Sequence, residues 1–127
     1  MTRLIAVFVG AGIGGALRWQ VGVVAARWFR DAFPWGTLFI NVSGSFVMGA
    51  LAGLFLERPD AERWQIARLF LLTGVLGGYT TFSSFSLEAI TLWERGDVLA
   101  AALYCIGSVI LGLAGLMIGL VMVRSFS

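Results

Sequence analysis

The sequence contains no histidine, no lysine and a single cysteine, Cys105, among its 127 residues. Zinc and similar ions are bound by sets of histidine and cysteine side chains, so no transition-metal site is expected. The same absences exclude a Ser-His or Cys-His nucleophile pair and an internal disulfide. All nine basic residues are arginines scattered along the chain, so no nucleic-acid surface is indicated and no nucleic-acid partner is expected.

Charged residues of either sign are also scarce. Only 13% of the residues are charged and 59% are apolar, with a mean hydropathy of +0.92. A soluble domain is about 25% charged and roughly 45–50% apolar. A chain this small cannot bury so much apolar surface in one soluble core. The composition therefore predicts an all-α integral membrane protein.

The charges that are present divide the chain into four apolar stretches, each at or above the roughly 20 residues that cross a bilayer as a helix. We expect a single four-span membrane domain over residues 1–127. Its transmembrane helices are expected at about residues 4–26, 36–56, 66–93 and 98–123.

The third stretch is too long for a straight span and contains Gly-Gly-Tyr-Thr at residues 77–80. Glycine and threonine are poor helix formers, so these residues predict a third helix that is broken there. The glycines permit unusual dihedral angles and close backbone approach. Irregular backbone survives in lipid only where protein buries it or where it lines a polar cavity. A break would also expose carbonyl oxygens, which suit Na⁺ and similar cations.

The arginines give only a weak signal for orientation. Four spans place both ends on one side, with five arginines there against three or four on the other side. The positive-inside rule needs a clear excess. Two possibilities stay open: either copies insert both ways, or one orientation dominates. Polar residues within spans must face protein or water, so oligomerisation is expected, and two oppositely inserted copies would resemble an inverted repeat.

Asn41 and a phenylalanine pair are the first candidates for a polar site. The Asn41 amide, deep in the second stretch, either makes an interhelical hydrogen bond or donates to an anion path. Phe82 and Phe85 are three residues apart, so their rings share one side of a helix. Such a pair ordinarily packs in a core or against lipid. Here hydroxyl residues surround it, and the positive edge of a phenyl ring can approach an anion.

A polar stripe follows the predicted break. Thr81, Ser84 and Glu88 are spaced by three and four residues, which places them on one face of a helix. In the fourth stretch, Tyr104 and Ser108 are one turn apart and could oppose that stripe. Together these residues indicate a polar line through an otherwise apolar region.

Glu88 is the only acidic residue well within a span, and its role is open. It could pair with Arg18, extend to water near the end of the span, or take part in transport. From composition alone, three classes fit the chain: an ion channel, a proton-coupled small dual-topology exporter that uses Glu88, and an assembly factor that transports nothing.

Three stretches resemble the small dual-topology fluoride channels, the family called Fluc or CrcB. They are residues 14–18 (Gly-Gly-Ala-Leu-Arg), 36–46 (Gly-Thr-Leu-Phe-Ile-Asn-Val-Ser-Gly-Ser-Phe) and 77–85 (Gly-Gly-Tyr-Thr-Thr-Phe-Ser-Ser-Phe). The resemblance covers essentially the whole chain. It implies a fluoride-selective channel, not an enzyme, that forms an antiparallel homodimer with two pores. Fluoride would leave the cell passively through the inner (cell) membrane, which the protein crosses several times.

The resemblance also implies roles for individual residues. Arg18 would lie near an aqueous vestibule, and Glu88 would continue a polar track. Gly77 and Thr80 would give backbone carbonyls to a structural Na⁺ at the dimer axis. The fluoride pore would be lined by Asn41, Phe82, Phe85, Ser108, Tyr104, Thr81 and Ser84.

Overall fold

The computed structural model describes residues 1–29, 33–56 and 62–126, and these residues form helices and short connections without a strand. The predicted all-α class is therefore confirmed for this part of the chain. The elements in chain order are α1 Thr2–Trp28, α2 Trp35–Leu56, α3 Glu62–Arg68, the π-helix η1 Leu69–Leu76, α4 Gly77–Tyr79, α5 Phe82–Glu94 and α6 Val98–Arg124.

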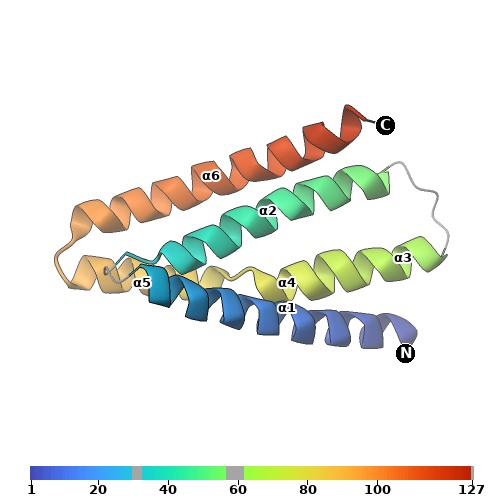
Figure 1. Ribbon diagram of the computed structural model, residues 1–127, viewed down its shortest axis with the longest axis horizontal. Helices are drawn as coiled ribbons and strands as arrows, with labels where there is room; N and C mark the ends of the chain where they lie inside the picture. Colours follow the sequence, from blue (N-terminus) through green and yellow to red (C-terminus); the bar gives the residue numbers. More distant parts are fainter. Residues whose placement is uncertain (30–32, 57–61, 127) are drawn as a thin grey trace.

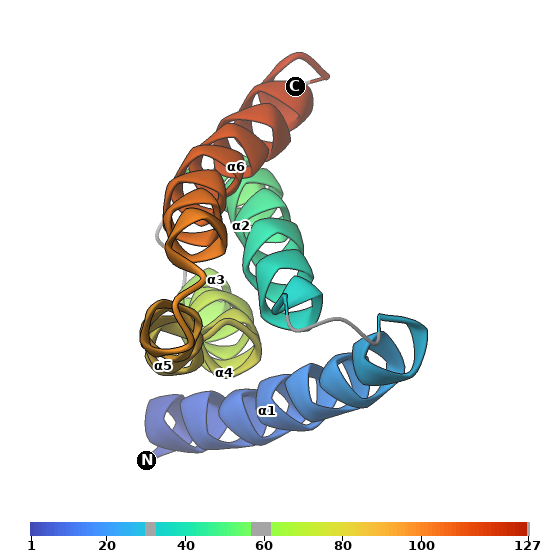
Figure 2. The same ribbon diagram turned by 90° about the vertical axis from the view of Figure 1, so that its left-hand side faces the viewer.

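Three of the described helices, α1, α2 and α6, are long and apolar enough to cross a membrane. The segment from α3 to α5 passes back between them in shorter pieces. Figure 1 shows α6 lying along α2, and α1 lying along α3 and α4, with both termini at the same end of the molecule. Figure 2 shows the α3–α5 segment between α1 and the pair formed by α2 and α6.

Small residues set the distances between these helices. A Cβ atom on Gly14 of α1 would collide with the carbonyl oxygen of Val75, and one on Gly78 would collide with that of Ala11. Between α2 and α6, a Cβ atom on Gly49 would meet the Leu116 carbonyl oxygen in the same way. Close backbone approach of this kind is how membrane helices gain packing energy, because lipid supplies no hydrophobic drive for their association.

The third helix breaks at Thr80 and Thr81, at the end of the stretch that the sequence indicated. Thr80 (φ −77°, ψ 160°) and Thr81 (φ −150°, ψ 123°) are extended. Gly77 is helical, with φ −63° and ψ −36°. Of the two uses that the sequence offered for these glycines, unusual dihedral angles and close backbone approach, the structure has the second, since Gly96 is the only described glycine with positive φ. Packing against α1 accounts for the lack of a Cβ at Gly78.

The threonine side chains stabilise the break on both sides. The Thr80 Oγ1 hydroxyl donates to the carbonyl of Leu76 at 2.9 Å, which covers the end of α4. Thr81 is the N-cap of α5, because its Oγ1 accepts a hydrogen bond from the Ser84 amide at 3.2 Å. A threonine at this position satisfies one of the amides that the first turn of a helix leaves unpaired.

Candidate functional site

Asn41 of α2 holds the break in the third helix. Its Nδ2 donates to the carbonyl oxygen of Thr81 at 2.9 Å, and its Oδ1 accepts from the Thr81 amide at 2.9 Å. The Asn41 Oδ1 thus replaces the main-chain partner that the Thr81 amide loses where the helix stops, and the Nδ2 adds a bond to the N-cap carbonyl of α5. In a membrane the amide would otherwise lack a partner. Of the two alternatives for Asn41, the interhelical hydrogen bond is present, and a second N–H of the same amide is left for another acceptor.

A cavity of about 350 Å³ lies beside this contact, between α2, the break and α6. Its wall combines polar and apolar side chains. The lining residues are Asn41, Gly44, Ser45, Met48, Thr80, Thr81, Phe82 and Leu116. The structure therefore brings three of the predicted pore residues, Asn41, Thr81 and Phe82, to one cavity.

The hydroxyls after the break form a hydrogen-bonded chain. Thr81 Oγ1 donates to Ser84 Oγ at 3.1 Å, and Thr81 Oγ1 and Ser83 Oγ lie 3.3 Å apart. Glu88 is one further turn along the same face of α5. The predicted stripe of Thr81, Ser84 and Glu88 thus runs along one face of α5 from the break.

Two hydroxyls from neighbouring helices fix the Glu88 carboxylate. Thr37 Oγ1 of α2 donates to Glu88 Oε1 at 2.8 Å, and the Tyr104 hydroxyl of α6 donates to Glu88 Oε2 at 2.7 Å. Tyr104 has no exposed surface. Sequence reasoning missed Thr37, although it lies one turn before Asn41 on the same face of α2.

Arg18 does not pair with Glu88 in the described residues. Its Nη1 instead donates to the carbonyl oxygen of Thr80 at 3.5 Å, across from α1 to the break. Of the three roles considered for Glu88, the ion pair is thus replaced by hydrogen bonds to neutral hydroxyls. Arg18 places its positive charge near the break.

Phe82 and Phe85 lie at the start of α5 with ring centroids 5.7 Å apart and planes tilted by 43°. Phe85 packs inward, with its ring centroid 5.1 Å from that of Tyr104. Phe82 is 80% exposed and points out of the single chain beside the polar cavity. The two rings therefore lie beside each other on α5, one facing the protein interior and the other facing outward.

Ser108 lies one turn beyond Tyr104 on α6. Its Oγ atom is buried and has no hydrogen-bond partner among the described residues. Buried hydroxyls in folded proteins nearly always have a partner. The Ser108 hydroxyl is therefore able to donate to a water or an ion that reaches α6.

The break also frees main-chain oxygens. In a continuous helix the Thr81 amide would bond to the carbonyl of Gly77, but here it bonds to Asn41. Gly77 is exposed, and the Thr80 carbonyl lies within reach of Arg18. No cluster of three or more His, Cys, Asp or Glu side chains that could hold a metal occurs in the described ranges. The released carbonyls are hard oxygen donors, which fits a cation such as Na⁺.

Comparison with known proteins assigns the family. The pattern of the family described as CrcB-like protein, Camphor Resistance (CrcB), matches residues 5–120. The chain belongs to the CrcB-like family. The matched range contains every predicted site residue, from Arg18 to Ser108. The resemblance that the three sequence stretches indicated is thereby confirmed for this CrcB-like protein.

Its relatives match along almost their whole length. Fluoride-specific ion channel FluC 2 of Nitrobacter hamburgensis is 55% identical over 118 residues, covering 93% of this chain and 94% of that protein. Fluoride-specific ion channel FluC of Rhodopseudomonas palustris is 52% identical over 127 residues, and that of Beijerinckia indica is 54% identical over 127 residues. Both of these cover 100% of each chain.

The variant Asn41→Ala is expected to destabilise the CrcB-like protein strongly. It leaves the Thr81 amide without a partner, and an unpaired buried group costs about 1–3 kcal/mol, so the expected loss is roughly 1–3 kcal/mol. Equilibrium unfolding in mixed detergent micelles measures it. Ser45→Ala, which lines the same cavity, is the control and is expected to change the free energy of unfolding by less than about 1 kcal/mol. Equal effects of the two variants would contradict this role of Asn41.

Proposed function

We propose that this CrcB-like chain is a fluoride-selective ion channel, not an enzyme, which exports F⁻ passively and so lowers cytoplasmic fluoride. Relatives that match it over 100% of both chains carry the name fluoride-specific ion channel. The structural observation that supports the proposal most is the chain of hydroxyls at Thr81, Ser83 and Ser84, with Glu88 one turn further along the same helix. It runs beside Phe82 and Phe85 along a helix that begins at a break.

The chemistry of these groups suits a small, strongly hydrated anion. A pore for such an ion must replace the water of its hydration shell with closely spaced donors. The second Asn41 N–H, the Ser108 hydroxyl and the hydroxyls of Thr81 and Ser84 are candidate donors, and the phenyl edges add weaker positive potential. The donors along this line are neutral, which suits passage because a fixed cation would hold the anion too tightly to let it leave.

The segment from α3 to α5 forms the fourth span in this proposal, so that residues 1–127 make a single four-span domain of the inner (cell) membrane. The two termini at one end of the molecule support an even number of crossings (Figure 1). Two such chains form an antiparallel homodimer with dual topology. Phe82, 80% exposed beside a polar cavity, supports the dimer, because a partner would cover the cavity and turn it into a pathway.

In the dimer, the carbonyls of Gly77 and Thr80 from both copies hold a structural Na⁺ at the dimer axis. The support for this site is that Gly77 is exposed and its carbonyl has lost its helical partner to Asn41. The bound ion would supply positive charge where several carbonyl dipoles converge. Arg18 donates to the same Thr80 oxygen at 3.5 Å, so in this proposal its side chain moves toward the vestibule when the ion binds.

A proton-coupled exporter that uses Glu88 is the alternative. Glu88 accepts hydrogen bonds on both carboxylate oxygens, from Thr37 and Tyr104, which fixes its position at the end of the hydroxyl chain. A carrier of this class needs the carboxylate to exchange its proton with alternating sides of the membrane. The two functions differ in whether a proton gradient is required.

The flux experiment uses purified full-length protein in liposomes loaded with potassium fluoride, with a fluoride electrode outside and valinomycin to release the voltage. A channel is expected to give fluoride efflux that starts with valinomycin, needs no proton gradient and excludes chloride. Efflux that requires a proton gradient and disappears in Glu88→Gln would establish the exporter. Liposomes that hold their fluoride under this voltage would exclude the channel, and liposomes that also hold it under an imposed proton gradient would exclude the exporter.

The two phenylalanines give a sharper test of the path. Phe82→Ile and Phe85→Ile keep apolar bulk but remove the ring edge, so each is expected to lower fluoride flux by about tenfold or more, the effect of losing roughly 1.4 kcal/mol. The dimer should still assemble. Phe8→Ile is the control, since Phe8 is 79% exposed on α1, away from the break. Wild-type flux in both variants would show that the rings only pack.

The dimer and its sodium ion are tested together. In the Cys105→Ala background, a Thr2→Cys protein is labelled with an impermeant thiol reagent from either side of the cell membrane, and labelling from both sides is expected. The mass of the purified protein in detergent is then measured in sodium and in N-methylglucamine. A shift toward the single chain without sodium is expected. Labelling from one side only, or an unchanged mass, would contradict the respective part of the proposal.

A further inference from the structure

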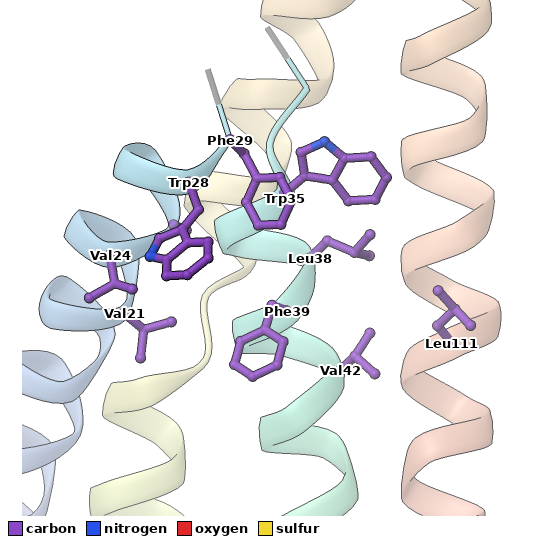
Figure 3. A pocket seen from close by; sticks show the side chains of 10 residues that line it. Val21, Val24, Trp28, Phe29, Trp35, Leu38, Phe39, Val42 and Leu111 are labelled. Carbon is purple, nitrogen blue, oxygen red and sulfur yellow. The ribbon is translucent and has the colours of Figure 1, made fainter. Parts of the chain in front are cut away.

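An apolar groove of about 590 Å³ opens between the C-terminal half of α1 and the N-terminal half of α2. Figure 3 shows how its walls are built, with side chains of both helices facing the same space. The principal wall residues are Val21, Val24 and Trp28 of α1, and Trp35, Phe39 and Val42 of α2. A volume of this size lies in the range of about 300–1,000 Å³ that is typical of small-molecule sites.

The groove lies on a different side of α2 from the polar cavity. Gly44 faces the break, because a Cβ atom there would contact the side chains of Thr80 and Tyr79. Val42, two residues earlier, points about 200° away around a helix of 3.6 residues per turn. A second copy that covered the break would leave this groove open to the membrane.

The length and ends of the groove suit a lipid tail. Its walls run from residue 21 to residue 28 on α1 and from residue 35 to residue 42 on α2, or about 10 Å along each helix axis. Half of a bilayer's hydrocarbon core is about 15 Å thick. Trp28 and Trp35 stand at the end near the connection between the two helices, where tryptophan marks the membrane surface. The groove therefore leads from the headgroup level toward the bilayer centre.

Among the described residues of α1 and α2, Arg27 is the charged residue near the mouth. Arg27 is exposed in the last turn of α1, one turn beyond Val24 of the wall. Neither α1 nor α2 contains an acidic residue. A guanidinium group binds phosphate oxygens with two parallel hydrogen bonds. Arg27, next to the lining residue Trp28, thus offers such a group to a phosphodiester, while the interior complements a hydrocarbon chain.

The back wall of the groove is shared with a third cavity, which is distinct from the polar cavity beside the break. Ala25, Phe29 and Trp35 line both the groove and this third cavity of about 250 Å³, which contains Thr37 and Glu88. α1 and α2 meet closely there, since a Cβ atom on Gly36 would lie 3.0 Å from that of Ala25. Whatever fills the groove supports the wall that separates Glu88 from the lipid side.

We propose that this groove binds one acyl chain of a membrane phospholipid, with the headgroup phosphate held by Arg27. The bound chain closes the outer wall of the Thr37–Glu88 cavity and holds the end of α1 against α2. The site depends on the groove alone and stands whether or not the chain conducts fluoride.

The experiment uses the full-length protein in detergent micelles with a limiting amount of phosphatidylglycerol that carries a diazirine on one acyl chain. After irradiation, the adducts are mapped by peptide mass spectrometry. Labelling is expected to concentrate on residues 21–28 and 35–42 and to be displaced by unlabelled phosphatidylglycerol. Residues 117–122 of α6 form an exposed apolar surface too and provide the internal comparison. Equal, non-displaceable labelling of all three segments would overturn the proposal.

Two pairs of variants separate the groove from general lipid contact. Val42→Trp fills the groove and excludes a few methylenes, so the concentration of phosphatidylglycerol needed for displacement is expected to rise about tenfold. Ile118→Trp adds the same bulk to the α6 surface and is expected to change nothing. Arg27→Gln is expected to weaken binding without filling the groove, whereas Arg124→Gln in the last turn of α6 is not.

If Val42→Trp does not fold, the comparison of Arg27→Gln with Arg124→Gln still tests the proposal. Unchanged labelling in Arg27→Gln, with Val42→Trp either misfolded or labelled like the wild type, would overturn the proposal. The mass of each variant in detergent is measured in parallel. If Val42→Trp keeps wild-type labelling but reduces the mass to that of the single chain, the groove is an interface between copies instead of a lipid site.

Discussion

The paired hydrogen bonds between the Asn41 amide and the main chain of Thr81 are the constraint on which the rest of the structure depends. A helix cannot stop in the middle of a membrane unless its freed amide and carbonyl find partners. One side chain from α2 bonds to both the amide and the carbonyl of Thr81 at 2.9 Å. Because Asn41 replaces the helical partner of the Thr81 amide, the chain can run extended through Thr80 and Thr81 and begin α5 anew.

The consequences of the break lie on both sides of it. Before it, the Gly77 carbonyl loses its usual partner and becomes available to a cation. After it, Thr81 caps α5 and starts a line of hydroxyls that ends at Glu88. Phe82, the first residue of α5, is left on the outer surface of the single chain. A cation site, an anion path and a surface for a second copy can thus all arise from one interruption.

The carboxylate end of this line is built from three helices. Thr37 of α2 and Tyr104 of α6 both donate to Glu88 of α5. The cavity on the other side of Glu88 is closed by α1, where Ala25 packs against Gly36. The polar path and the apolar groove outside it therefore share a wall only one layer of side chains thick. The position of α1 affects both, although α1 contributes no hydroxyl to the path.

The sequence by itself determined the class of the protein, since apolar runs this long with so few charges are stable only as helices in lipid. It also determined the family, through the stretches around Arg18, Asn41 and Phe82, and it located the break to within a residue or two. It could not assign the glycines, because an unusual dihedral angle and a close helix contact both require a missing Cβ. The tertiary structure shows that Gly78 serves a close helix contact, because the backbone of α1 lies where its Cβ atom would be. Likewise, the tertiary structure alone brought Thr37 to Glu88, paired Asn41 with Thr81 and opened the groove beside Trp28, because these arrangements depend on which helix faces lie together in space.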